Sequence, residues 1–325
     1  MPNRATTTGL PRADIKGTLL EMPMPNRYLG LEIFTPFPVL KNRGSYGVIP
    51  REESAKRQDV KKSPGSGYNR IDFDFEDASY RCRKRGIELP VDDEEREEYA
   101  ELIDFEVVLG DRGRTVVLTE QEIRCKDLIH NLTTFPLSGN TGYSLANEWD
   151  DAEFADPIGD IQRGREAIRA RSGFLPNTLQ IAWQTWYDLW ACDQIKERRP
   201  NTILQDTPDP DDMAARRALA SILGLKEILI GDQFYDSAKP GQTAIITDIW
   251  SQEYAFLFYR DPNPRDFARP TLGRCHHNDK NGGLLEFYDY SEEAIEGEVI
   301  RVKQCVGEAI VVAEVGFLFG NVYTA

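Results

Sequence analysis

The segment DPIGDIQRGREAIRARSGFLPNTLQIAWQTWYDL, residues 156–189, constrains the fold of this chain more than any other stretch. Pro157 suits the first turn of a helix, because the N–H that proline lacks has no partner there. Ser172-Gly173 ends this helix, and the apolar run Thr178–Ile181 is typical of a strand. Aromatic residues then recur at helical spacing, a pattern that usually marks a core: Trp183, Trp186, Tyr187 and Trp190. The segment therefore predicts helix, turn, strand and helix.

The overall charge limits the classes of partner. The 325 residues carry a net charge of −15, which argues against a protein that grips nucleic acid along its surface, because phosphate contacts need excess Lys and Arg. This charge does not exclude a protein that encloses nucleic acid. No apolar run is long enough for a membrane span, and the N-terminus lacks the apolar region of a secretory signal. Five dispersed cysteines without CxxC spacing indicate reduced thiols.

Residues 1–30 are polar and rich in Pro, Gly and Thr, so this segment cannot bury enough surface to fold alone. Two interpretations stay open for it: a disordered tail, or an arm that becomes ordered against a neighbouring subunit.

A long polar loop separates two expected extended segments, LEIFTPFPVL at 31–40 and the alternating IDFDF at 71–75. A loop of this length without its own structure is unusual inside a compact domain, so it is either disordered or committed to a partner. Basic residues outnumber acidic ones in it. Those that we expect to contact another subunit are Arg51, Lys56, Arg57, Lys61 and Lys62.

An acidic run follows, in GIELPVDDEEREEYAEL at 86–102. Its first four carboxylates are a candidate surface for contact with another subunit: Asp92, Asp93, Glu94 and Glu95. A solvated face is the simpler alternative, and a divalent-cation site is a weaker one.

A single long helix is expected from about Glu98 to Leu132. Apolar residues seven positions apart form its expected buried stripe: Leu102, Leu109, Val116 and Ile123. The competing interpretation starts a new helix at Thr119, where Thr119 and Glu122 have the spacing of a capping box.

The second half of the chain alternates helix and strand. A helix capped by Asp209 or Asp211 should end at Gly224, before a strand at 226–230. The runs AIITDIW and EYAFLFYR are β-rich, residues 261–283 are expected to form a loop, and two β segments rich in Val and Ile end the chain.

Motifs that carry catalytic or cofactor chemistry are absent: no Walker A motif, no GxGxxG after a strand, no GxSxG and no HExxH. Cys275-His276-His277 with Asp279 is the one cluster that resembles metal ligands. Adjacent histidines rarely point at one ion, so an exposed loop is the favoured interpretation. The sequence therefore predicts no catalytic, cofactor-binding or metal-binding residues.

The run GFLPNTLQIAWQTWYDL at 173–189 resembles the opening of the A-domain in major capsid proteins of tailed double-stranded DNA bacteriophages, the Hong Kong bacteriophage-type (Johnson) fold. Gly86–Asp93 and the long helix after it are similar to the E-loop exit and spine helix of that family. The match is imperfect, since Asp248-Ile249-Trp250-Ser251 lacks the family's glycine after the tryptophan and the region around Cys275 has no counterpart.

The resemblance implies an α+β fold with an N-terminal arm, an extended E-loop, a P-domain with a long spine helix and β-strands, and a mixed α/β A-domain. The implied boundaries are an N-terminal arm at 1–30, the E-loop and its flanking strands at 31–90, the first part of the P-domain at 91–154, the A-domain at 155–285 and P-domain return strands at 286–325.

The function implied is that of a structural protein rather than an enzyme. Such a protein self-assembles as hexamers and pentamers into an icosahedral shell that encloses double-stranded DNA without sequence-specific binding. It would be assembled in the host cytoplasm, would reside in the virion capsid and would have scaffolding, portal and decoration proteins as further partners. An encapsulin-type nanocompartment shell, which shares the fold, is the alternative, and a soluble enzyme with an unrecognised site is the third hypothesis.

Overall fold

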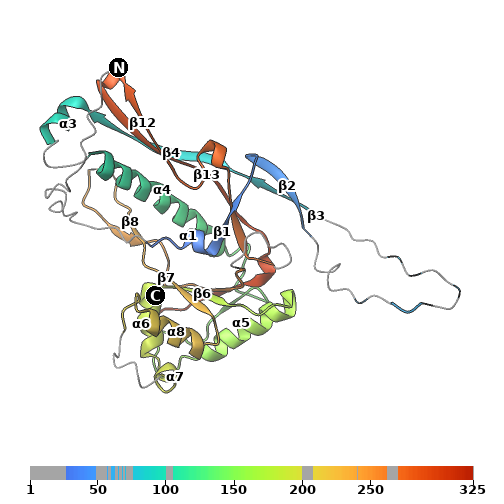
Figure 1. The fold of residues 1–325 in the computed structure, drawn as a ribbon. Helices are drawn as coiled ribbons and strands as arrows, with labels where there is room; N and C mark the ends of the chain where they lie inside the picture. Colours follow the sequence, from blue (N-terminus) through green and yellow to red (C-terminus); the bar gives the residue numbers. More distant parts are fainter. Residues whose placement is uncertain are drawn as a thin grey trace.

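The computed structural model describes residues 27–48, 57, 60–62, 65, 68, 70, 76–99, 105–199, 208–239, 241–261 and 270–324. These residues form an α+β fold with two five-stranded sheets and two smaller two-stranded ones (Figure 1). In this described part, no helix is both long and apolar enough to cross a bilayer. The N-terminal segment 1–26 and the expected strand at 71–75 lie outside the described residues.

The first five-stranded sheet is built on one long strand, β13 (Gly297–Ile310). On one side β13 pairs with β12 (Glu286–Glu292) and β11 (Gly273–His277), and on the other side with β4 (Arg83–Asp92). Strand β1 (Phe34–Pro38) pairs in parallel with β11 and follows the short helix α1 (Gly30–Ile33). The segment expected to be one extended stretch at 31–40 is thus a helical turn followed by a strand.

Helix α4 (Phe105–Ile129) lies along this sheet (Figure 1). It is continuous through Thr119, so the expected long helix is confirmed over this range and the alternative of a new helix at Thr119 is wrong. Its expected beginning is different, because a separate short helix, α3 (Asp93–Tyr99), precedes it, and residues 100–104 lie outside the described part.

The expected apolar stripe of α4 is not its buried face. Val116 is 40% exposed, whereas Val117, Gln121 and Cys125 are buried. A glycine fits this interface because the helix lies close to the sheet: a Cβ at Gly113 would stand 2.6 Å from Cγ2 of Val302. The heptad spacing therefore gave the wrong phase, because small and polar residues make the contact with the sheet.

The second five-stranded sheet has the order β5 (Gly142–Ser144), β14 (Gly316–Gly320), β10 (Ala255–Phe258), β6 (Thr178–Ala182) and β7 (Glu227–Gly231). The side chains of β6, β7, β10 and β14 are mostly buried on both faces, which explains why these strands are rich in apolar residues and lack a regular polar alternation. Helices cover one face, and Figure 1 shows them together: α5 (Pro157–Ser172), α6 (Trp183–Ala191), α7 (Asp193–Lys196) and α8 (Met213–Ile222).

The elements expected at 156–189 are confirmed. The carboxylate of Asp156 accepts a hydrogen bond from the backbone N–H of Gly159 at 2.9 Å, and Pro157 occupies the first turn of α5. Gly173 ends the helix with φ +80, a left-handed conformation that favours glycine. Trp186 and Trp190 are fully buried, but Trp183 is 36% exposed, so the aromatic stripe is only partly core.

A second core lies between the two large sheets. It joins apolar residues of α1 and of the C-terminal end of α4 to the other face of the second sheet, including Ile33, Ile129, Phe256 and Leu318. The two sheets are therefore connected by buried packing as well as by the chain.

Three local expectations are corrected. The N-cap of α8 is Asp212, whose carboxylate accepts from the backbone N–H groups of Ala214 and Ala215, rather than Asp209 or Asp211. The range 261–283 is not all loop, because β11 crosses it as a buried strand and pairs with strands on both sides. Sheet membership also crosses the expected chain ranges: β11, within 155–285, belongs to the first sheet, and β14, within 286–325, belongs to the second.

Short elements complete the described fold. Two-stranded sheets are formed by β2 (Arg43–Val48) with β3 (Glu76–Arg81) and by β8 (Phe234–Asp236) with β9 (Ile246–Asp248). Single 3₁₀ turns occur at Asp279–Asn281, Glu293–Ile295 and Ala313–Val315.

Candidate assembly surfaces

A two-stranded ribbon, β2 with β3, extends away from the first sheet (Figure 1). Burial alternates along β2, so one face of the ribbon is half-buried toward the body and the other is exposed. An isolated two-stranded ribbon is marginally stable in water at best. Its outer part is therefore a surface that gains from contact with a partner.

The predicted basic residues belong to the connection between the two strands of this ribbon. Arg57, Lys61 and Lys62 are exposed, and the ammonium group of Lys62 lies 4.6 Å from the centroid of the Tyr68 ring. Arg51 and Lys56 lie outside the described residues. The three described cations thus lie on the surface of the subunit.

The predicted acidic residues lie where β4 passes into α3. Asp92, Asp93 and Glu94 are exposed, and Glu95 lies on α3, where its backbone alone is described. The carboxylate of Asp92 accepts a hydrogen bond from the backbone N–H of Glu94 at 2.9 Å. Such a turn holds the start of the acidic run in a defined position.

Additional acidic residues, missed in the sequence, lie beside this run. The backbone N–H of Asp93 donates to the carbonyl of Glu296 at 3.3 Å, and Glu292, Glu293 and Glu296 are all exposed. The run SEEAIEGE at 291–298 was the available signal. We call these residues with Asp92–Glu95 the acidic end of the first sheet.

One cation lies within the acidic end. Arg96 forms ion pairs at 3.1 Å with Glu298 and at 3.9 Å with Asp93. Its side chain is 46% exposed, so these pairs stabilise little, and the net charge of the surface stays negative.

The root of the ribbon and the acidic end lie far apart within one subunit. They are separated by β4, whose first residue, Arg83, is next to the root of the ribbon and whose last residue is Asp92. Ten residues of strand span about 30 Å. Figure 1 shows the ribbon and α3 pointing away from each other at opposite ends of the sheet.

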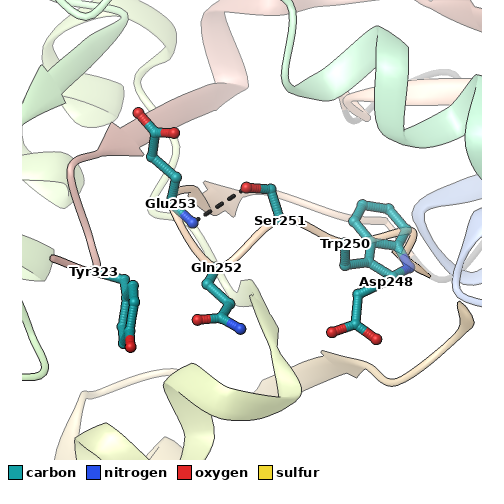
Figure 2. Close-up of a pocket in the computed structure, with 6 residues that line it drawn as sticks. All are labelled: Asp248, Trp250, Ser251, Gln252, Glu253 and Tyr323. Carbon is teal, nitrogen blue, oxygen red and sulfur yellow. Dashed lines mark hydrogen bonds between the residues drawn. The ribbon is translucent and has the colours of Figure 1, made fainter. Parts of the chain in front are cut away.

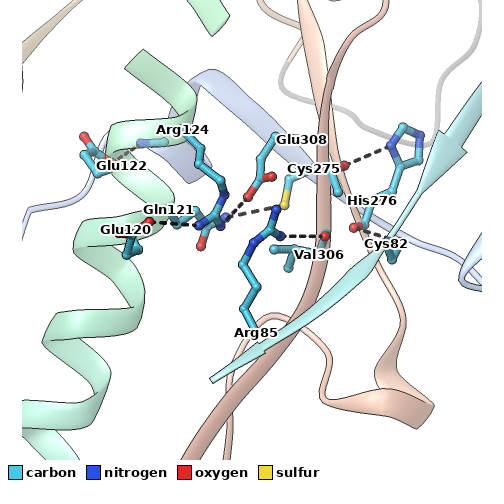
Figure 3. Close-up of polar contacts among 12 residues, drawn as sticks. Cys82, Arg85, Glu120, Gln121, Glu122, Arg124, Cys275, His276, Val306 and Glu308 are labelled. Carbon is cyan, nitrogen blue, oxygen red and sulfur yellow. Dashed lines mark hydrogen bonds and ion pairs between the residues drawn. The ribbon is translucent and has the colours of Figure 1, made fainter. Parts of the chain in front are cut away.

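The contact between α4 and the first sheet contains a buried ion pair (Figure 3). Arg124 on α4 binds Glu308 on β13 at 3.0 Å, and the Glu308 side chain is only 5% exposed. Arg85 on β4 donates to the carbonyl of Val306 at 3.3 Å. The Arg124–Glu308 pair fixes the helix on the sheet, because separating it would leave the Glu308 carboxylate buried without its partner, whereas the Arg85 bond joins β4 to β13.

Glu122 connects three parts of the molecule. Its carboxylate accepts hydrogen bonds from the backbone N–H of Leu29 at 2.9 Å, from that of Gly30 at 2.7 Å and from the indole N–H of Trp250 at 2.8 Å. Burial raises the pKa of this carboxyl to about 7, and the three hydrogen bonds oppose that rise. Glu122, which the sequence suggested as part of a capping box, thus joins the start of α1 and Trp250 to helix α4 through buried hydrogen bonds.

The Cys275-His276-His277 cluster lies on β11 and is buried, so the expected exposed loop is wrong. Burial raises the pKa of the Cys275 thiol and lowers the pKa of His276. His277 pairs with Asp279 at 3.4 Å. Within the described residues no three histidine, cysteine, aspartate or glutamate side chains are arranged to hold a metal ion.

An open hollow of about 340 Å³ lies beside the second sheet (Figure 2). Among the described residues that line it, none is a histidine, lysine or cysteine. The Ser251 hydroxyl accepts from the backbone N–H of Glu253 at 3.2 Å, and Asp248 accepts from Trp183 and Gln184. This arrangement orders a turn and lacks an activated nucleophile.

Two curated relatives are similar to this chain over most of its length, although no protein-family model matches it. The major capsid protein of Burkholderia phage BcepMu is 25% identical over 224 residues, 68% of each chain. The major capsid protein of Pseudomonas phage JBD67 is 20% identical over 302 residues, 92% of this chain and 93% of that protein. The chain is a major capsid protein of the tailed-phage type.

Solved structures support the fold of this capsid protein. A phage-related protein from Bordetella bronchiseptica RB50 has a TM-score of 0.64 at 18% identity and covers 95% of each chain. The capsid structure of cyanophage P-SCSP1u has a TM-score of 0.58 at 10% identity and covers 94% of this chain and 90% of that one. The α+β capsid fold expected from the sequence is therefore confirmed at this level.

The capsid protein forms the shell of the phage head and is a structural component of the virion rather than an enzyme. Both curated relatives are phage capsid proteins, which favours a phage head over the nanocompartment alternative.

Proposed function

We propose that this capsid protein assembles as hexamers and pentamers into an icosahedral shell around double-stranded DNA, and that the basic connection of one subunit binds the acidic end of a neighbouring one. The first sheet with α4 acts as the P-domain, the second sheet with its helices as the A-domain, and the ribbon as the E-loop. Scaffolding, portal and decoration proteins stay predicted partners.

The separation of the two charged surfaces along β4 carries this proposal. Arg57, Lys61 and Lys62 belong to the connection beyond the root of the ribbon, whereas Asp92 and Glu296 are at the other end of the sheet. A contact between two different surfaces of identical subunits repeats around a ring, so every subunit both donates and accepts it. Each exposed ion pair contributes only about 0–1 kcal/mol, but in a closed ring each subunit is held by several neighbours at once.

The charge of the whole chain is consistent with enclosing DNA. A net charge of −15 opposes tight binding along the phosphate backbone, so the shell would contain DNA without holding it through a large basic surface.

The first test replaces Arg51, Lys56, Arg57, Lys61 and Lys62 with serine. The melting temperature of the unassembled subunit should change by no more than a few degrees, while shells measured by sedimentation should be largely lost. Wild-type assembly should also weaken as salt rises, because the Debye length is about 8 Å at 0.15 M.

A charge exchange is the matched control. Replacing the five basic residues with glutamate should abolish assembly, and so should replacing Asp92, Asp93, Glu94 and Glu95 with lysine. Combining the two sets restores complementary charges and should recover shells. Normal assembly of the serine variant, or no recovery in the combined variant, would show that these surfaces do not bind each other.

A further inference from the structure

The root of the ribbon carries two tyrosines on one face. Tyr46 on β2 pairs with Ala78, and Tyr80 on β3 pairs with Gly44. Residues two apart on a strand share a face, and so do residues paired across two strands. Gly44 and Tyr46 are two apart on β2, and Tyr80 is paired with Gly44, so both tyrosine rings lie on the half-buried side of the ribbon. Gly44 leaves room for this arrangement, since a Cβ there would stand 2.7 Å from the Tyr80 hydroxyl.

Both tyrosine rings meet the imidazole of His276. The Tyr80 ring is stacked on it at 4.8 Å between centroids with an angle of 10° between planes. The Tyr46 ring is 5.7 Å away at 29°. His276 is 3% exposed and lies in the middle of β11, between Phe37 of β1 and Gly307 of β13, so the ring is held by the body of the first sheet (Figure 3).

Hydrogen bonds close the root itself. The backbone N–H of Cys82 donates to the carbonyl of Asn42 at 2.8 Å. The side-chain oxygen of Asn42 accepts from the amides of Asn278 at 2.7 Å and Asn281 at 3.0 Å. These bonds fix the two points where the chain enters and leaves the ribbon, and the Cys82 thiol adds a bond to the His276 carbonyl at 3.3 Å. None of them involves a residue of β2 or β3, so they do not by themselves set the tilt of the ribbon.

We propose that His276 is a positioning residue for assembly: its ring, stacked against Tyr46 and Tyr80, fixes the direction in which the ribbon leaves the first sheet. The stack contacts both strands beyond the root, so it removes the tilt that the Asn42 bonds allow. This inference rests on the proposed function of the ribbon as the arm that reaches a neighbour. An arm whose direction is already set before contact has less conformational freedom to lose on binding.

The test measures the ribbon directly in the unassembled full-length chain. Spin labels are attached to Asp77→Cys at the outer part of β3 and to Asp127→Cys on α4, both of which are exposed. All five native cysteines are buried, so labelling is selective for the introduced ones. The distance distribution between the labels is then compared for the parent protein, His276→Ala and His276→Phe.

We expect a narrow distribution in the parent, a distribution at least about twofold wider in His276→Ala, and a narrow one again in His276→Phe, which keeps an aromatic ring. Shell yield should follow the same order, about tenfold lower for alanine and recovered by phenylalanine. Recovery by phenylalanine would show that the stacked ring, rather than the imidazole nitrogens, sets the direction, and the distance distribution separates this from a general loss of stability. If His276→Ala does not fold, Tyr46→Ser, at a half-buried position, gives the same comparison.

A narrow distribution in His276→Ala at the parent distance overturns the proposal, and so does a wide distribution with normal shell yield. Failure of the proposed function would be a separate result. Normal assembly of the five-residue serine variant would refute the charged contact between subunits, but it would not change the spin-label distances that test the role of His276.

Discussion

Replacing Glu122 with glutamine tests how the start of α1, helix α4 and the turn before β10 are joined. The carboxylate is 1% exposed and accepts three hydrogen bonds, two at one oxygen from Leu29 and Trp250 and one at the other from Gly30. Glutamine keeps one acceptor oxygen but places an amide NH₂ opposite a donor. Compared with the charged carboxylate, one buried N–H is then without an acceptor, a loss of about 1–3 kcal/mol that the protonated carboxyl shares.

The pH dependence gives the sharper measurement. Burial raises the pKa of Glu122 from its ordinary 4.5 to about 7, so between these two values the folded chain holds a proton that the unfolded chain has released. The unfolded state therefore binds fewer protons, and the free energy of unfolding falls as pH rises through this interval. Each pH unit corresponds to about 1.4 kcal/mol, which gives about 3 kcal/mol over the whole interval.

Glutamine does not titrate, so the Glu122→Gln variant should lack this component. We expect the two proteins to have similar stability near pH 5, where the wild-type carboxyl is protonated and also offers one acceptor fewer, and the wild type to be about 3 kcal/mol less stable than the variant by pH 8. Guanidinium unfolding of the unassembled subunit, followed by tryptophan fluorescence at pH 5, 6, 7 and 8, measures both proteins under the same conditions. Trp250 reports on the site because its indole N–H binds the replaced group.

Glu120→Gln is the matched control, two residues away on the same helix with a side chain that is 67% exposed. Its difference from wild type should stay within about 0.5 kcal/mol at every pH. A constant difference between wild type and Glu122→Gln across the pH range would refute the reasoning, because it would mean that the three hydrogen bonds outweigh burial and keep the carboxylate charged at pH 5.

The remaining predictions concern the two cores. Trp186→Ala should lower the free energy of unfolding by about 3–5 kcal/mol, because the ring is fully buried and its indole N–H donates to a carbonyl. Trp183→Ala should cost less, about 1–2 kcal/mol, because the ring is 36% exposed although it donates to Asp248. Equal losses in the two melts would contradict the burial argument. Gly113→Ala should cost about 1–3 kcal/mol, since the new methyl would stand 2.6 Å from Val302, and an unchanged melting temperature would show that α4 can move off the sheet.

Local chemistry is what the sequence predicted best. Helix α5 begins at Pro157 behind an Asp156 cap and ends at Gly173, and each boundary depends on residues within a few positions of it. The resemblance to phage capsid proteins also came from this region, and the comparisons bear it out. Short-range signals of this kind need no knowledge of the rest of the molecule.

Long-range packing explains the errors. Strand β11 reads GRCHH, which lacks the pattern of a buried strand, yet it is buried because β1 and β13 pair with it on both sides. The buried face of α4 contains Gly113, Gln121 and Glu122, residues that no hydrophobic count would select. Their burial depends on partners more than 90 residues away in the chain, such as Leu29 and Val302.

The sequence by itself determined the chain order of helix, turn, strand and helix over residues 156–189, the acidic and basic runs and the absence of catalytic motifs, because composition and spacing are properties of the chain. Tertiary structure alone decided that β14 crosses to the second sheet, that Glu292, Glu293 and Glu296 join the acidic run, and that the acidic and basic surfaces lie at opposite ends of β4. Two charged runs within 40 residues of each other could fold into contact, and the stiff extended strand between them is the physical reason that they do not.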